Sequence, residues 1–333
     1  MSGIQEVTKE YLNRIENILQ NKPDYMRSFT NYLTDSSIRT RYNYLNYMCT
    51  FIDFVKKQPE ELVFDDFNNY MNHVSYKANG QLKSSSYRIA VYSALKRFCE
   101  YLYVSKRISV NYMLDIKKPK SIESQVTIKK REKGYLTEEE IKEYIDNIDT
   151  YRETHRIRHS KEWDIRDKAI IVMFLTTGIR NSALRMLDVS DIDLDKKTMM
   201  VTDKGEKVKT YNLSKKLCKI LSEWLECREK IKNEIEKEKF DTEALFISQE
   251  HFARMGSTSV KKIVKKYADC FPHKNITPHK LRATYGTQLY NKTNDIYFVQ
   301  ECMGHSDPKT TEIYIRDKKQ NTKKASSIMD GLL

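Results

Sequence analysis

Cationic side chains recur in short segments of the second half of the chain, where they could grip a phosphate. Arg180 follows a Thr-Thr-Gly-Ile stretch at the end of a buried apolar run. His279 and Arg282 lie three residues apart after Thr277 and Pro278, so they share one side of the first turns of a predicted helix. Arginine offers a planar fork of donors that suits phosphate, and helix amino termini favour anions. Each segment alone is weak, because an isolated arginine is usually a surface or structural residue.

Two further segments supply an imidazole, a phenol and a lysine. His305 follows Gly304, which is expected to end one helix, and Tyr314 comes about two turns into the next. Lys204 lies in Asp-Lys-Gly-Glu at the centre of a predicted β-hairpin. A tyrosine among 22 is normally a packing or surface residue, and a hairpin lysine is normally a solvated charge. A nucleophile and a mobile proton donor are the functional alternatives.

Taken together and in this order, the segments resemble the catalytic domain of the tyrosine recombinase (phage integrase) family. The resemblance covers roughly residues 136–315 and implies six catalytic residues, which are Arg180, Lys204, His279, Arg282, His305 and the nucleophile Tyr314. At the hairpin, Asp203 replaces a family glycine, and Lys207 and Lys209 are nearby substitutes if the alignment slips. Ala183 stands where the family often has glutamate, a departure not expected to cost activity.

The resemblance also implies the reaction. It points to cleavage and rejoining of DNA through a 3′-phosphotyrosine and a Holliday junction, in a tetramer on two DNA sites, without a cofactor, ATP or a metal. Two alternatives stay open: a type IB topoisomerase-like or hairpin-resolving enzyme, and a DNA-binding accessory protein without catalysis. The two-domain layout favours a recombinase, and the complete catalytic set argues against an accessory factor. Integration or excision of a mobile element, DNA inversion and dimer resolution are not distinguished.

The elements that must position these residues are mostly helical, since the chain has only 9 glycines and 6 prolines. Apolar spacings of three and four predict helices in both halves, over residues 36–55, 64–74, 84–102, 169–178, 214–234 and 258–268. Thr137 and Glu140 form a capping-box pattern at the start of another helix. Residues 198–202 and 207–213 predict the β-hairpin. The fold class expected is mainly α, with a helical core-binding (SAM-like) domain and a mostly helical catalytic domain containing a small β-sheet.

A break in periodicity divides the chain. We expect a core DNA-binding domain in residues 1–120, with an extra helix within 1–25, a basic linker over 121–134, and a catalytic domain over 135–333. The tail from residue 315 ends in a small apolar cluster, formed by Ile328, Met329, Leu332 and Leu333. By analogy with the family, this cluster is expected to dock on a neighbouring protomer, with packing in cis or fraying as the alternatives.

The net charge and the cysteine spacing limit which partners and cofactors we expect. The formal net charge is +13 and the pI about 9.2, which favours a polyanion such as double-stranded DNA. The longest apolar run, residues 169–175, is far shorter than the ~20 residues of a membrane span, and the first residues do not look like a secretory signal. The six cysteines are scattered, so we expect buried, reduced thiols in the cytoplasm and no zinc site.

Overall fold

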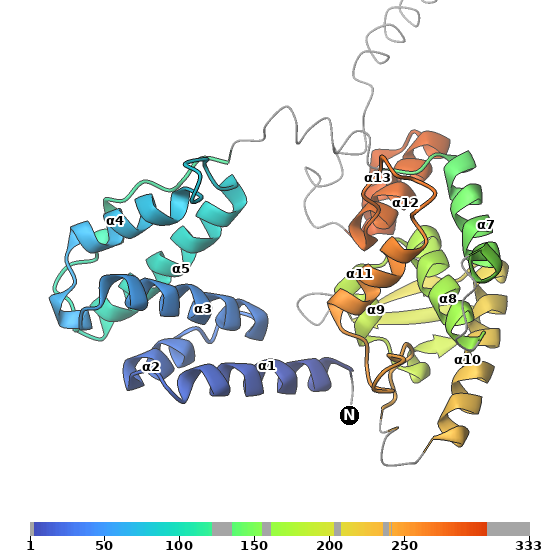
Figure 1. The fold of residues 1–333 in the computed structure, drawn as a ribbon, viewed down its shortest axis with the longest axis horizontal. Coiled ribbons are helices and arrows are strands. Elements are labelled where there is room, and N and C mark those ends of the chain that lie inside the picture. The colour runs from blue at the N-terminus through green and yellow to red at the C-terminus, as the bar shows by residue number, and fades with distance from the viewer. Residues whose placement is uncertain are drawn as a thin grey trace, which may run out of the picture. The chain divides into compact units, whose positions relative to one another are not determined.

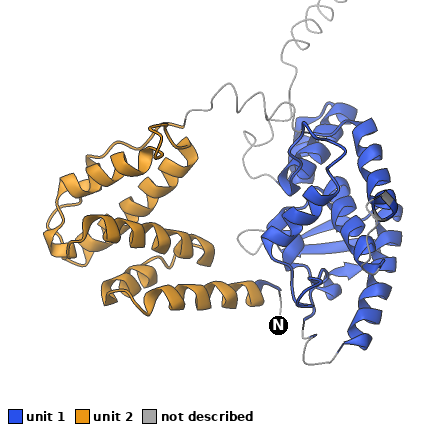
Figure 2. Ribbon diagram, viewed as in Figure 1, with its two compact units in different colours: residues 1–4, 128–333 blue, residues 5–127 orange. Residues whose placement is uncertain are grey.

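The computed structural model describes residues 3–121, 135–154, 161–202, 208–235, 240 and 242–304. The chain divides into two compact units (Figure 2). Unit 1 comprises residues 1–4 and 128–333, and unit 2 comprises residues 5–127. Among the described residues, no helix has the length and apolar character needed to span a membrane.

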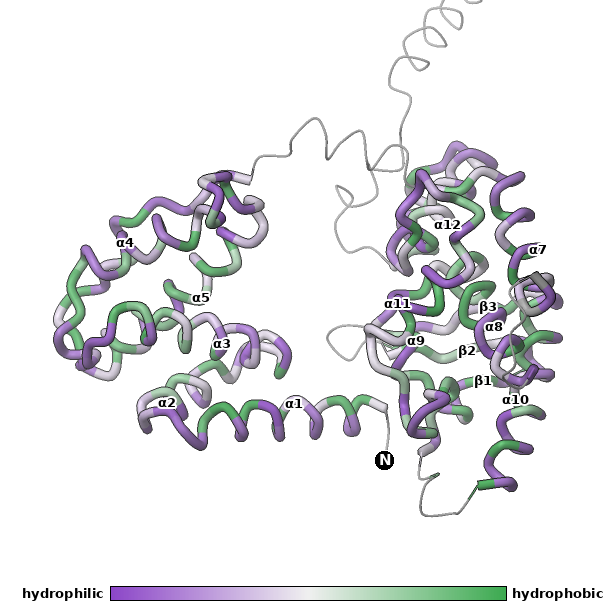
Figure 3. Tube along the Cα trace, in the orientation of Figure 1, coloured by the Kyte–Doolittle hydropathy of each residue, from purple (hydrophilic) through white to green (hydrophobic). Residues whose placement is uncertain are grey.

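Unit 2 is helical (Figure 1). It contains α1 (Gly3–Leu19), α2 (Asp24–Tyr32), α3 (Ile38–Val55), α4 (Phe64–Ser75) and α5 (Ser85–Val104), with 3₁₀ turns at Pro59–Glu61 and Tyr112–Leu114. The first two residues of α1 are counted in unit 1, and the rest of the helix belongs to unit 2. Hydrophobic and hydrophilic residues alternate along α1 in Figure 3, as one-sided burial requires. The side chains of Ser37 and Ser84 cap α3 and α5 by accepting hydrogen bonds from the N–H groups of Thr40 and Tyr87, at the predicted starts of these helices.

Aromatic rings fill the core of unit 2. Phe51, Phe29 and Phe98 are fully buried, and the rings of Phe29 and Phe98 meet edge to face at 5.0 Å. Sequence periodicity missed α2, which has only nine residues and follows Pro23. The expected extra helix within residues 1–25 is present as α1.

Unit 1 surrounds a buried helix with further helices and one small sheet. The helices are α7 (Glu138–Thr154), α8 (Glu162–Thr177), α9 (Asn181–Met186), α10 (Lys215–Glu234), α11 (Ser257–Lys266), α12 (Pro278–Thr293) and α13 (Ile296–Met303), with a 3₁₀ turn at Val189–Asp191. Strands β1 (Ile192–Asp193), β2 (Thr198–Thr202) and β3 (Val208–Asn212) form an antiparallel sheet in the order β1-β2-β3. The predicted hairpin is therefore confirmed as β2 and β3, and β1 was not predicted. The expected mainly α fold with a small sheet is confirmed.

Helix α8 organises this unit because it packs against α7, α10, α11 and α12. Its residues from Ala169 through Phe174 are all buried, so this stretch of the helix is apolar on every side. The predicted capping box precedes α7, with the Thr137 N–H donating to Glu140 Oε2 at 2.8 Å and the Glu140 N–H to Thr137 Oγ1 at 3.2 Å.

The cysteines correct one expectation. All six are free thiols, as predicted, but only Cys99 is buried, and the other five are partly exposed. Scattered spacing indicates the lack of a disulfide framework, and it does not by itself fix burial.

Candidate active site

The end of α8 places Arg180. Gly178 ends the helix in the left-handed region, with φ of 61°, and its N–H donates to the Phe174 carbonyl at 3.1 Å. A Cβ at this position would overlap the ring of Tyr285, so glycine is required here for space as well as for conformation. Two residues later, Arg180 is the extended N-cap residue of α9.

The start of α12 places the second pair. Thr277 caps the helix by accepting a bond from the Lys280 N–H at 3.3 Å, and Pro278 occupies the first turn, as predicted. One turn separates His279 from Arg282, but their surroundings differ. His279 is exposed, whereas Arg282 is 4% exposed and points into unit 1.

The two arginines meet at the carboxyl end of α13. Arg282 donates from Nη1 to the Gly178 carbonyl and from Nη2 to the Met303 carbonyl, the latter at 2.6 Å. Arg180 donates from Nη2 to the carbonyl of Gly304 at 3.1 Å. Residues from three separate elements are thus gathered at one point, and both guanidinium groups lie beside the end of α13.

A third cation reaches the same helix end. Lys209, on β3, donates from Nζ to the carbonyls of Glu301 at 2.6 Å and Cys302 at 3.0 Å. Sequence reasoning named Lys209 only as a substitute for Lys204, and this contact was not foreseen. The signal available was weak, namely a lysine two residues before buried Tyr211 on one face of a strand.

Three of the six predicted catalytic residues lie outside the described residues: Lys204, His305 and Tyr314. Lys207 and the apolar cluster of the tail lie outside them too. In the sequence, His305 is the residue after Gly304. The expected linker over 121–134 is described only at its first residue.

Tyr285 is a described tyrosine beside this site, since its ring lies against Gly178. Burial raises its pKa, and the charge of Arg282 lowers it to a smaller extent. Because burial disfavours phenolate, Tyr285 is poorly suited to act as a nucleophile.

Ala183, the departure from the family pattern, is 5% exposed and packs in the core of unit 1. A carboxylate at this depth would need a partner, so alanine simply removes that requirement.

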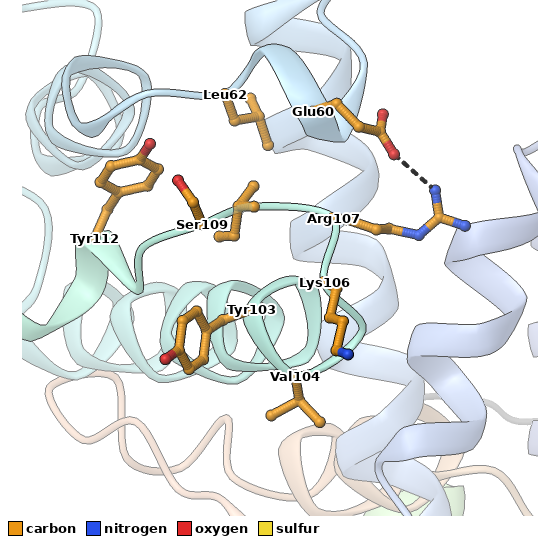
Figure 4. Close-up of a pocket in the computed structure, with 9 residues that line it drawn as sticks. Glu60, Leu62, Tyr103, Val104, Lys106, Arg107, Ser109 and Tyr112 are labelled. Carbon is orange, nitrogen blue, oxygen red and sulfur yellow. Dashed lines mark hydrogen bonds and ion pairs between the residues drawn. The ribbon is translucent and has the colours of Figure 1, made fainter.

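Unit 2 carries a pocket of about 690 Å³ between the end of α5 and the turn at Pro59–Glu61 (Figure 4). Two of the residues that line this pocket form an ion pair, in which Arg107 donates to Glu60 at 3.0 Å. No predicted catalytic residue lines it. Within the described ranges, no group of three His, Cys, Asp or Glu side chains could hold a metal ion.

Comparison with known proteins identifies the family of this chain. The model of the phage integrase family matches residues 134–321, and that of the phage integrase N-terminal SAM-like domain matches residues 24–106. Tyrosine recombinase XerC of Caldanaerobacter subterraneus subsp. tengcongensis is 30% identical over 322 residues, covering 88% of this chain and 82% of that protein. XerC of Thermodesulfovibrio yellowstonii is 29% identical over 301 residues, covering 89% and 92%.

Solved structures share the fold. XerH site-specific recombinase, bound to palindromic difH substrate in a post-cleavage complex, has a TM-score of 0.64 at 20% identity, with 97% of this chain and 89% of that chain covered. A lambda integrase dimer bound to a COC′ core site has a TM-score of 0.57 at 17% identity, with 93% and 96% covered. The resemblance found in the sequence is confirmed: this chain belongs to the phage integrase family of tyrosine recombinases.

Proposed function

We propose that this chain cuts and rejoins double-stranded DNA at specific sites through a covalent bond between Tyr314 and a backbone phosphate. One observation carries the proposal. Arg180 and Arg282 donate to the carbonyls of Gly304 and Met303, directly before the predicted catalytic residue His305. Two fixed guanidinium groups, with an imidazole next in the chain, are what a phosphodiester transition state requires.

Each residue then has a stated task. Charge gathers on the non-bridging oxygens during attack, and Arg180 and Arg282 neutralise it in place. The Tyr314 oxygen bonds to phosphorus, while the bond from phosphorus to the 5′-oxygen breaks. The phenolic proton passes to His279, whose exposed ring can meet a substrate from outside. Lys204 gives a proton to the departing 5′-oxygen, and His305 donates a hydrogen bond to the phosphate.

The product is a 3′-phosphotyrosine and a free 5′-hydroxyl. Because the ester stores the energy of the broken bond, a 5′-hydroxyl from a partner strand can attack it and reverse the chemistry without ATP. No step in this sequence calls for a metal. Recombination of two sites takes two rounds of exchange through a Holliday junction, and each round cuts and rejoins two strands. This requires four active sites and hence a tetramer.

The two units support separate domains for DNA binding and for catalysis. Residues 1–120 form the core-binding domain, residues 121–134 the linker, and residues 135–333 the catalytic domain. The net charge of +13 supports binding of both domains to DNA phosphates. The biological task is integration or excision of a mobile element, DNA inversion, or dimer resolution. Six free thiols and a DNA substrate support a cytoplasmic location.

A nicked suicide substrate tests the proposal. After the DNA that the protein protects has been mapped, a duplex nicked next to the cleavage site loses a short fragment on cutting and traps the intermediate. We expect a protein–DNA adduct that survives denaturation, unchanged by excess chelator. Tight binding without an adduct would indicate an accessory protein, and loss of the adduct with chelator would refute the metal-free reaction.

Two tyrosine variants identify the nucleophile. Tyr314→Phe removes only the phenolic oxygen, so it should bind the duplex normally and form no adduct. Tyr285→Phe is the matched control, because burial raises the pKa of its hydroxyl, and this variant should form the adduct. The opposite result would move the nucleophile to Tyr285.

A further inference from the structure

Three cationic side chains donate hydrogen bonds to the carbonyls at the carboxyl end of α13, beside the backbone cap in which the Gly304 N–H donates to the Glu301 carbonyl at 3.0 Å. The last carbonyls of a helix have no partner within it. The carbonyl oxygens of residues 301–304 each accept a hydrogen bond from a cation: Lys209 bonds the first two, Arg282 the third and Arg180 the fourth. Positive charge also suits the negative end of the helix dipole. Of these three cations, Lys209 is the one without a role in the proposed reaction.

The position of Lys209 is fixed from β3. The residue pairs with Val201 in the β2–β3 register, two places from the five-residue strand's buried Tyr211. Its ammonium lies 4.9 Å from the centre of the Tyr211 ring, a distance typical of a cation–π contact. A Cβ added at Gly304 would lie 3.7 Å from Nζ. The lysine therefore ties the small sheet to the end of α13.

We propose that Lys209 is a positioning residue for the cleavage reaction, holding the end of α13 so that His305 enters the site in register with the two arginines. This inference rests on the proposed function. Because residue 305 is the next in the chain after Gly304, an anchor on the carbonyls of residues 301 and 302 fixes where that residue starts. A misplacement of about 1 Å at a reacting group can cost roughly 10²-fold in rate.

The same contacts argue that Lys209 is not the proton donor. A general acid must give up a proton to the leaving oxygen, and a neutral amine would then hold the two carbonyls more weakly. The Lys209 ammonium donates two hydrogen bonds to carbonyls of α13. We therefore assign anchoring to Lys209 and leave proton donation to Lys204.

Sulfur substitution in the DNA distinguishes the two roles. The test uses the nicked duplex that the wild-type protein cleaves, once with an ordinary phosphodiester and once with sulfur in place of the bridging 5′-oxygen. A thiolate leaves without protonation, so sulfur restores a variant that lacks the general acid. It does not restore a variant whose reacting groups are misplaced. The readouts are the single-turnover cleavage rate and the affinity for the same duplex.

Arginine is the decisive replacement. Lys209→Arg keeps charged donors for the carbonyls but cannot release a proton. We expect it to cleave the ordinary duplex within a few-fold of the wild-type rate. Lys209→Met keeps the length of the side chain and loses the donors, so it should cleave about 10–100-fold more slowly on both duplexes, with affinity within about two-fold. Lys204→Met should be slow on the ordinary duplex alone, and Lys216→Met, at an exposed residue of α10, should match wild type.

The outcomes separate the hypotheses. If Lys209→Arg is slow on ordinary DNA and is restored by sulfur, Lys209 is the general acid and the positioning role is wrong. Wild-type rates for Lys209→Met would also overturn it. Should Lys209→Met fail to fold, as thermal melting would reveal, the arginine variant still decides. Failure of the wild-type protein to form any adduct would instead overturn the proposed function.

Discussion

Arg282 joins the ends of two helices, since its buried guanidinium donates to the carbonyl of Gly178 at the end of α8 and to that of Met303 at the end of α13. The residue proposed to stabilise the transition state is thus also a structural clamp. Arg180 is only partly buried and bonds the carbonyl of Gly304. The two arginines should therefore differ in stability effects and agree in catalytic ones.

Replacing each arginine by alanine tests this difference. Arg282→Ala leaves two buried carbonyls without their donor, at about 1–3 kcal/mol each, so the free energy of unfolding should fall by about 2–6 kcal/mol. Arg180→Ala should cost about 1 kcal/mol. Both should slow single-turnover cleavage by about 10²–10⁴-fold. Denaturant titration gives the first quantity and suicide-substrate cleavage the second; equal stability losses would contradict the clamp.

Gly178→Ala should destabilise unit 1 more than conformation alone explains. The left-handed region costs a non-glycine residue about 1–2 kcal/mol, and the new Cβ would also overlap Tyr285. Gly80→Ala is the matched control, because φ is 75° there and nothing lies within 4 Å of the added Cβ. Thermal melting should therefore show a larger loss for Gly178→Ala. Equal losses would mean that Tyr285 moves aside freely.

Local signals predicted most helices of this fold. Serine or threonine caps at Ser37, Ser84, Ser214 and Thr277 lie at or next to the predicted helix starts, because a cap bonds its own first turn. Strand β1 was missed because it has two residues and depends on pairing with β2, which no local pattern encodes.

The sequence indicated the residue types of the candidate site but not their contacts. The order of Arg180, His279 and Arg282 indicated phosphate chemistry. Lys209 and Glu301 are 92 residues apart, and only the tertiary fold reveals their contact. The coverage of the α13 carbonyls by three cations could not be read from spacing for the same reason.

Affinity for DNA should fall steeply with salt. The excess of Lys and Arg, 59 against 46 Asp and Glu, implies that binding displaces many counterions from the phosphates. Between roughly 50 and 200 mM salt, contacts to six or more phosphates predict a loss of about 10³-fold or more in affinity. Fluorescence anisotropy with the mapped site measures this slope. A flat response would contradict wrapping of the duplex by both domains.

Removal of residues 326–333 should separate assembly from DNA binding. The segment carries the apolar residues Ile328, Met329, Leu332 and Leu333, which lie outside the described residues. A short apolar segment gains burial only against another surface, and in this family the neighbouring protomer often supplies it. We expect the truncated protein to bind a single site with nearly unchanged affinity but to lose cooperative assembly on two sites. Recombination should fall accordingly, while adduct formation on a suicide substrate persists.

Gel-shift titrations with one-site and two-site duplexes measure the two effects, and a variant with Asn321→Ala in the polar stretch before the cluster serves as control. Full recombination by the truncated protein would rule out docking in trans.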